Sequence, residues 1–109
     1  ELRQSMSSPI QIGSRSILLS DALIQLPDGS TLSLTATERT ILQKLAENRG
    51  HIVTYDALCE AVWGDGYYGY ENSLNVHIRH LREKIGENVG KPRYLITMRG
   101  IGYKLTEAR

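Results

Sequence analysis

The sequence predicts a single α+β domain in which short antiparallel strands come first, helices follow and a β-hairpin ends the fold. The 109 residues suffice for one hydrophobic core. Turn residues divide the apolar residues of 10–34 into short runs, and from Thr35 onward apolar residues recur at helical spacing. We expect residues 1–9 to be a linker remnant, 10–106 to form the domain and 107–109 to be a C-terminal tail.

The clearest turn signal in the first part of the chain is Asp28-Gly29. It separates two apolar runs, residues 23–26 and 31–34. Glycine tolerates positive φ angles, and an aspartate side chain can bond to nearby backbone amides, so this pair favours a β-hairpin. Residues 10–34 are therefore expected to form a small antiparallel sheet.

Two helices are predicted after this sheet. Thr35 and Glu38 have the spacing of a capping box, in which each side chain bonds to the other residue's backbone amide. Thr54 is a suitable cap for the second helix, which Gly64 ends. Residues 51–53 are expected to be a short extended link, so that the two helices are joined tightly.

A third helix is predicted at about residues 72–86, and its two sides differ in chemistry. At about 100° per residue, one apolar stripe is formed by Leu74, Ile78, Leu81 and Ile85. Outside the stripe lie Asn72, Ser73, Asn75, Val76, His77, Arg79, His80, Arg82, Glu83 and Lys84. Several of these side chains can bond base edges or phosphates, and Val76 could meet a thymine methyl group. The alternative is a polar face that is only solvated.

A β-hairpin is predicted after the third helix. Two β-type runs, residues 94–97 and 103–106, bracket a glycine-rich bend. Arg99 lies at or near the tip, where its guanidinium could enter a minor groove or clamp a phosphate. Helices joined by a tight turn and followed by such a hairpin make a winged helix-turn-helix.

The formal net charge is only +1, but the charges are sorted along the chain. Residues 1–75 hold five Lys/Arg against nine Asp/Glu, whereas residues 76–109 hold eight against three. This asymmetry suggests that the C-terminal third faces an anion, of which nucleic acid is the commonest extended example in a cytoplasm. Basic residues that merely solvate one face are the alternative interpretation.

Nothing in the sequence favours catalysis, a metal centre or a membrane span. Cys59 is a single cysteine and is expected to pack as a small hydrophobe. His77 and His80 have the spacing of a metal pair, with His51 as a third candidate, but no carboxylate or cysteine is spaced to complete the site. No apolar run approaches the ~20 residues that cross a bilayer, and the start lacks a secretory signal. We expect a cytoplasmic protein without enzymatic activity, cofactor or metal.

Over about residues 10–106 the chain resembles the C-terminal domain of the OmpR/PhoB family of response regulators. The motifs that carry the resemblance are Leu34-Thr35-x-x-Glu38, Val62-Trp63-Gly64, Val76-His-Ile-x-x-Leu-Arg82-x-Lys84 and Arg99-Gly-x-Gly-Tyr103. The resemblance implies a four-stranded N-terminal sheet, three helices and a C-terminal wing. It also implies a receiver domain in the full-length protein, whose aspartate accepts phosphate from a sensor kinase.

The resemblance implies sequence-specific binding of double-stranded DNA as the output domain of a bacterial two-component system. Family members bind direct repeats as dimers, with the third helix in the major groove and the wing, here residues 94–106, at the minor groove. The isolated domain is expected to be a monomer. The residues carried over in the helix are Ser73, Asn75, Val76, His77, Arg79, His80 and Arg82, and those in the wing are Thr97, Arg99 and Tyr103.

Within this set, the resemblance assigns His77, Arg82 and the wing residues to phosphates and the others to the groove. Two positions depart from the family pattern. His80 stands where relatives often have a base-reading arginine, and it is a weaker, pH-sensitive cation. Tyr55 stands where some relatives have a phosphate-binding arginine.

The loop of residues 64–70 is rich in tyrosine. In relatives this loop faces RNA polymerase, so the resemblance allows a polymerase contact through Asp65, Tyr67, Tyr68 and Tyr70. Tyrosine is favoured at protein interfaces, which leaves a second hypothesis, a winged-helix module that binds another protein through this loop. A third hypothesis, a small metal-dependent enzyme, depends only on the histidine pair. Steep salt dependence favours DNA, weak dependence favours a protein partner, and loss on chelation favours a metal.

Overall fold

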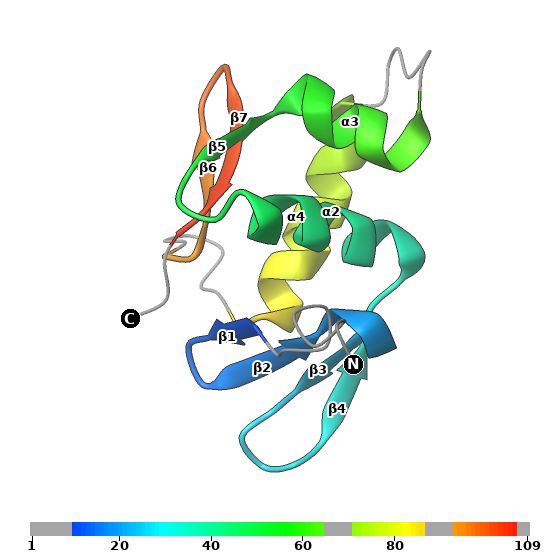
Figure 1. Ribbon diagram of the computed structural model, residues 1–109, viewed down its shortest axis with the longest axis vertical. Coiled ribbons are helices and arrows are strands. Elements are labelled where there is room, and N and C mark those ends of the chain that lie inside the picture. Colours follow the sequence, from blue (N-terminus) through cyan, green and yellow to red (C-terminus); the bar gives the residue numbers. More distant parts are fainter. Residues whose placement is uncertain (1–9, 65–70, 87–92, 107–109) are drawn as a thin grey trace, which may run out of the picture.

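The structure is a computed structural model that describes residues 10–64, 71–86 and 93–106 (Figure 1). The predicted linker 1–9, the loop residues 65–70 and the predicted tail 107–109 lie outside the described residues, as do residues 87–92 and the side chain of Asn72. In chain order, the elements are β1 (Ile10–Ile12), β2 (Arg15–Leu18), the 3-10 helix η1 (Leu19–Asp21), β3 (Leu23–Gln25), β4 (Thr31–Ser33), α2 (Ala36–Glu47), β5 (Ile52–Thr54), α3 (Tyr55–Trp63), α4 (Glu71–Lys84), β6 (Leu95–Met98) and β7 (Gly102–Leu105).

Two antiparallel sheets lie at different sides of the three helices (Figure 1). The N-terminal sheet has the order β1-β2-β3-β4, and the C-terminal sheet has the order β5-β7-β6. Helix α4 runs from the side of α3 toward the N-terminal sheet, and α2 packs against both other helices (Figure 1). This arrangement confirms the predicted winged helix-turn-helix and the four-stranded N-terminal sheet.

The hairpin between β3 and β4 forms where Asp28-Gly29 predicted it. The Asp28 carboxylate accepts hydrogen bonds from the backbone amide of Ser30 at 2.9 Å and from its hydroxyl at 2.6 Å. Gly29 has a φ of +91°, a left-handed conformation that an L side chain rarely adopts. Local chemistry therefore determines the conformation of this turn. In β3, the strand before it, Ile24 is buried in the core.

The capping box of α2 is also present as predicted. The Thr35 hydroxyl accepts from the Glu38 amide at 3.1 Å, and a Glu38 carboxylate oxygen accepts from the Thr35 amide at 3.0 Å. Thr54 caps α3 in a similar way, because its hydroxyl accepts from the Ala57 amide at 3.1 Å. Both caps satisfy amides that have no partner within the helix.

Residues 51–53, predicted to be a short extended link, are extended, but the sequence analysis did not predict that they pair with the wing. Ile52–Thr54 is strand β5, and it pairs antiparallel with β7 in the register Val53↔Tyr103 and Thr54↔Gly102. The wing is therefore part of a three-stranded sheet and is joined to the helix-turn-helix by backbone hydrogen bonds. Three residues are too few to show an alternating pattern, and their partner strand lies far along the chain.

The whole predicted apolar stripe lies in the core, with Leu74, Ile78 and Leu81 on α4 and Ile85 directly after its last residue. The four stripe residues are buried together with side chains of α2, of α3 and of both sheets. Cys59 is fully buried in the same cluster, as expected for a small hydrophobe. Burial of the stripe turns the opposite side of α4 toward solvent.

Candidate nucleic-acid interface

The outer face of α4 carries most of the predicted site residues in exposed positions. The exposed side chains are Ser73, Asn75, Val76, Arg79 and His80. Val76 has 51% of its surface exposed, so this apolar side chain faces away from the core. This face combines an apolar contact, an amide and a guanidinium, the side-chain types that read base edges in a major groove.

Arg82, on the wing side of α4, connects this helix to the wing. Its Nε donates to the backbone oxygen of Leu95 at 2.9 Å, and one terminal nitrogen donates to the Thr97 hydroxyl at 2.8 Å. The guanidinium carbon also lies 6.0 Å from the centre of the Tyr103 ring, within cation-π range. Arg82 therefore fixes the position of β6 relative to α4.

Tyr103 lies on the inner face of β7 and is only 3% exposed. Its ring packs edge-on against Tyr55, with centres 5.5 Å apart and planes at 83°. Its hydroxyl donates a hydrogen bond to the side-chain oxygen of Asn75 on α4. Burial raises the pKa of Tyr103, so the hydroxyl keeps its proton and remains a donor. The predicted wing residue Tyr103 and the predicted groove residue Asn75 are thus in direct contact.

The bend of the wing presents Arg99 to solvent. The Ile101 amide donates to the Met98 oxygen at 2.9 Å, which closes the turn. Gly100 has a φ of +80°, and Ile101 is 49% exposed beside it. Arg99 is exposed at this bend, as the sequence predicted.

On the opposite flank of α4, two histidines lie near other helices. His77 is half-buried, and its ring centre lies 6.2 Å from that of Trp63 at the end of α3. His80 is close enough to Glu38 of α2 to influence the ionisation of its carboxyl. Across 10–64, 71–86 and 93–106, no three His, Cys, Asp or Glu side chains are grouped so that they could hold a metal ion.

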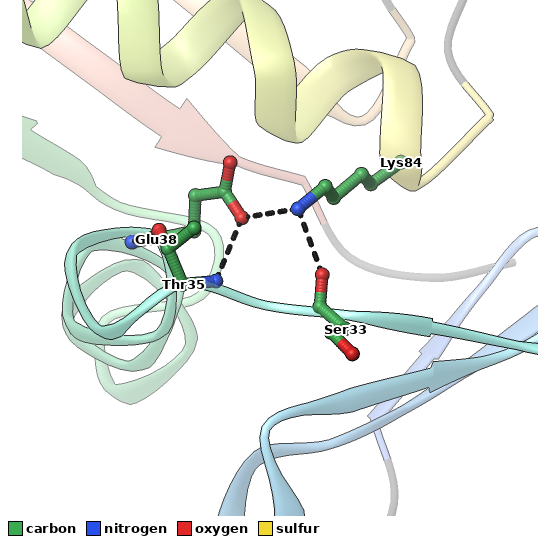
Figure 2. A network of polar contacts seen from close by, with 4 residues as sticks. All are labelled: Ser33, Thr35, Glu38 and Lys84. Carbon is green, nitrogen blue, oxygen red and sulfur yellow. Dashed lines mark hydrogen bonds and ion pairs between the residues drawn. The ribbon is translucent and has the colours of Figure 1, made fainter.

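The sequence analysis missed an ionic contact between α2 and α4 (Figure 2). Lys84 Nζ donates to a carboxylate oxygen of Glu38 at 2.7 Å and to the backbone oxygen of Ser33 at 2.7 Å. Glu38 is 2% exposed, and its contacts are to Lys84 and to Thr35 of its own capping box. The sequence analysis placed Lys84 outside the apolar stripe and predicted no partner for it. No local pattern identifies this pair, because the two residues lie 46 positions apart.

The ionisation of Glu38 depends on this contact. Burial raises the pKa of its carboxyl, but hydrogen bonds from the Lys84 ammonium and the Thr35 amide outweigh burial, so the pKa is lowered. The carboxylate therefore stays charged in the folded chain and links α2 to Lys84 of α4, whose ammonium also bonds to Ser33 at the end of β4.

Other arginines join distant segments by donating to backbone oxygens. Arg15 of β2 donates to the Lys84 oxygen at 2.6 Å, at the C-terminal end of α4. Arg49 donates to Thr106 at 2.8 Å and to Gln11 at 3.0 Å. The sequence analysis assigned no role to Arg15 or Arg49. The structure uses them to hold the N-terminal sheet and the C-terminal strand against the helices.

Two further predictions concern loops and membranes. The proposed polymerase-contact residues Asp65, Tyr67, Tyr68 and Tyr70 lie outside the described residues. Of the helices in the described part of the chain, none is both long enough and apolar enough to cross a bilayer.

Comparison with known proteins identifies the family. Residues 29–105 match the family described as "Transcriptional regulatory protein, C terminal". Regulatory protein VanR of Enterococcus faecium is 47% identical over 75 residues, which cover 68% of this chain and 32% of VanR. The alkaline phosphatase synthesis transcriptional regulatory protein PhoP of Bacillus subtilis is 44% identical over 80 residues, covering 73% of this chain and 33% of PhoP. The chain therefore spans about one third of the length of these relatives.

Solved structures show the same fold. The Klebsiella pneumoniae RstA DNA-binding domain, crystallised in complex with the RstA box, has a TM-score of 0.75 and 31% identity, over 90% of this chain and 96% of that one. The Thermotoga maritima response regulator DrrB, described as an OmpR/PhoB homolog, has a TM-score of 0.79 and 29% identity, over 97% of this chain and 48% of DrrB. From the match of residues 29–105 and from these relatives, we conclude that the chain belongs to the family of transcriptional regulatory protein C-terminal domains, the winged-helix domains of OmpR/PhoB-type response regulators.

Proposed function

We propose that this domain binds double-stranded DNA sequence-specifically, as the transcriptional output domain of a two-component response regulator. Helix α4 enters the major groove, and the β6–β7 hairpin lies at the adjacent minor groove. The observation that carries the proposal is the outer face of α4, where Val76 is 51% exposed beside the exposed guanidinium of Arg79. The similar RstA domain was crystallised with its DNA box, which supports DNA binding by this fold.

The burial and hydrogen bonds of each residue divide the proposed site into three roles. The groove readers are Ser73, Asn75, Val76, Arg79 and His80, all of them exposed. Phosphate contacts fall to His77, Thr97 and Arg99. Arg82 and Tyr103 act mainly as positioning residues, since their polar groups already bond to the wing and to α4.

The proposal extends to the whole protein through its longer relatives. A receiver domain would control the output domain, two copies would bind a direct repeat, and the loop of residues 65–70 would contact RNA polymerase. DNA binding of this kind needs no cofactor, metal or catalytic step. A bacterial regulator that binds DNA would act in the cytoplasm. The family match does not favour the alternative of a protein-interaction module.

The test is fluorescence anisotropy of the chain with random DNA duplexes at several salt concentrations, followed by sequencing of the bound fraction. Each neutralised phosphate steepens the fall of log K with log salt by about 0.9, so several contacts give a steep slope. The expected result is a steep slope together with an enriched motif. Absence of binding at low salt would refute the proposal and favour the alternative, a winged-helix module that binds another protein.

A further inference from the structure

Asn75 is exposed on the outer face of α4, yet its side chain is bonded to the wing. The hydroxyl of Tyr103, a buried residue of β7, donates a hydrogen bond to the amide oxygen of Asn75. An exposed side chain without such a bond can move among several rotamers. The amide oxygen has a second lone pair and the amide nitrogen has two hydrogens, so groups remain to bond a base. The contact therefore restricts the Asn75 side chain without using up its capacity to read.

Tyr103 is itself held in place on several sides. Its ring packs edge-on against Tyr55, with centres 5.5 Å apart, and the Arg82 guanidinium carbon lies 6.0 Å from the ring centre. Strand β7 is also paired on both sides, by β5 and by β6. A binding side chain is positioned precisely when the residues that support it are locked by packing. Tyr103 meets that condition for Asn75.

The burial of Tyr103 argues against a contact of its own with DNA. Only 3% of the residue is exposed, and its hydroxyl proton is already donated to Asn75. A phosphate oxygen accepts hydrogen bonds and therefore needs a donor that it can reach. The resemblance assigns Tyr103 to phosphates, but the geometry favours an indirect role through the Asn75 side chain.

Prior restriction of a base-reading side chain affects sequence specificity. A side chain that becomes ordered only on binding lowers the affinity by about two- to tenfold. A base contact forms only on the correct sequence, so this cost falls on the preferred site and not on random DNA. A side chain that is already restricted in the free protein avoids most of the cost.

We propose that the wing takes part in reading the major groove through Tyr103, which holds the Asn75 side chain in place for its base without touching DNA itself. This inference rests on the proposed function and adds a coupling between the wing and the base-reading face of α4. Tyr103 is the positioning residue, and Asn75 is the contact residue.

The first experiment measures the Asn75 side chain in the absence of DNA. The heteronuclear NOE of its amide group reports picosecond to nanosecond motion. In the wild type this NOE is expected to approach the values of backbone amides in α4, and it should fall in Tyr103→Phe, which removes the hydroxyl and keeps the ring. Tyr55→Phe, which removes a hydroxyl from the neighbouring ring, should leave it unchanged. A wild-type Asn75 amide as mobile as that of Gln25, an exposed residue of β3, would overturn the inference whether or not the domain binds DNA.

The second experiment is a double-mutant cycle on DNA binding with the wild type, Asn75→Ala, Tyr103→Phe and the double variant. Anisotropy gives the affinities for random duplexes and for the preferred duplex that selection with the wild type identifies. Tyr103→Phe is expected to lower the ratio of preferred to random affinity by about threefold, with the affinity for random duplexes unchanged. In the Asn75→Ala background the same change should have no further effect, because Tyr103 acts only through Asn75.

The opposite outcomes are equally distinct. A loss on both duplexes that persists in the Asn75→Ala background would show that Tyr103 contacts phosphates. A ratio that neither single variant changes would show that the contact plays no part in reading. Thermal unfolding followed by circular dichroism verifies that each variant folds, and if Tyr103→Phe does not, the wild-type NOE of Asn75 decides. Absence of salt-dependent binding by the wild type would refute the proposed function, and with it the role in reading, even where the NOE shows a restricted side chain.

Discussion

At the scale of single residues, the arginines of this domain divide by what their guanidinium groups touch. Arg15 and Arg49 donate to backbone oxygens of distant segments, and Arg82 bonds to strand β6. Arg79 and Arg99 are exposed. Substitution of Arg15, Arg49 or Arg82 is therefore expected to lower the stability of the fold. Substitution of Arg79 or Arg99 is expected to lower the affinity for DNA.

Arg79→Ala is expected to weaken binding to the preferred site by about 1–3 kcal/mol while leaving binding to random DNA nearly unchanged, because a base contact acts only on the correct sequence. Anisotropy titrations with both duplexes measure the difference. Lys44→Ala, a change of a cation on α2, is the control. An equal loss on both duplexes would contradict a base-reading role for Arg79.

Lys84→Met is expected to lower the free energy of unfolding by about 2 kcal/mol, because it leaves the buried Glu38 carboxylate without its cation. Urea unfolding measures this change. Lys44→Met removes a lysine that has no ion pair with any of the described residues, and it should change stability by less than about 0.5 kcal/mol. If both variants are equally stable, the Glu38 contact does not contribute.

At the scale of elements, the wing is a sheet rather than a free hairpin. Strand β5 joins the turn between α2 and α3 to β7, and Arg82 joins α4 to β6. The Tyr55 amide, at the start of α3, also donates to the Ile101 oxygen at 3.0 Å. The wing is thus held from both sides, which fixes the angle between its tip and the outer face of α4.

Gly102→Ala is expected to destabilise the domain by about 3 kcal/mol. The new Cβ would lie 2.0 Å from the Val53 backbone oxygen, so β5 and β7 would have to separate. Gly100→Ala has open space around its Cβ and a φ of +80°, so it reports only the left-handed strain, about 1 kcal/mol. Chemical denaturation compares the two variants, and similar losses would argue against a close approach at Gly102.

Arg99→Ala is expected to weaken binding to all duplexes alike and to reduce the salt slope by about 1, because a phosphate contact carries no base information. Measuring log K against log salt for the preferred and random duplexes tests this expectation. A loss confined to the preferred duplex would move Arg99 to base or groove-shape recognition.

At the scale of the whole molecule, the charges are distributed unevenly although the net charge is small. The net charge is +1, yet the exposed cations of α4 and the wing bend face the same proposed ligand, while acidic residues predominate in residues 1–75. One of these acids, Glu38 of α2, lies inside the fold and pairs with Lys84 of α4, which also bonds to Ser33 of β4. Global stability should therefore depend on pH through this buried carboxylate.

The pH prediction follows from the lowered pKa of Glu38. Because the pKa is lower in the folded chain than its ordinary value of 4.5, the stabilisation is complete above that value and is lost as pH falls through the folded pKa. The stability difference between the wild type and Glu38→Gln should therefore narrow as the pH falls below 4.5. Thermal unfolding of both proteins across this range measures the difference. A constant difference would mean that Glu38 contributes no ion-pair stabilisation.

Local chemistry was sufficient to predict most elements from the sequence. The Asp28-Gly29 turn, the Thr35 and Thr54 caps and the apolar stripe of α4 depend on residues within a few positions of each other. Such interactions form with little regard to the rest of the chain, so residue patterns report them directly. The exposed positions of Val76 and Arg99 follow from the same local periodicity.

Only the tertiary structure decided which distant residues meet. Strand β5 needs β7, Glu38 needs Lys84 46 positions away, and Tyr103 meets Asn75 28 positions away. These pairs form because packing of the apolar stripe brings the segments together, and no spacing along the chain encodes which partners result. For that reason the sequence by itself predicted which faces carry the candidate binding side chains, whereas the packed structure decided which of those side chains bond to other parts of the fold.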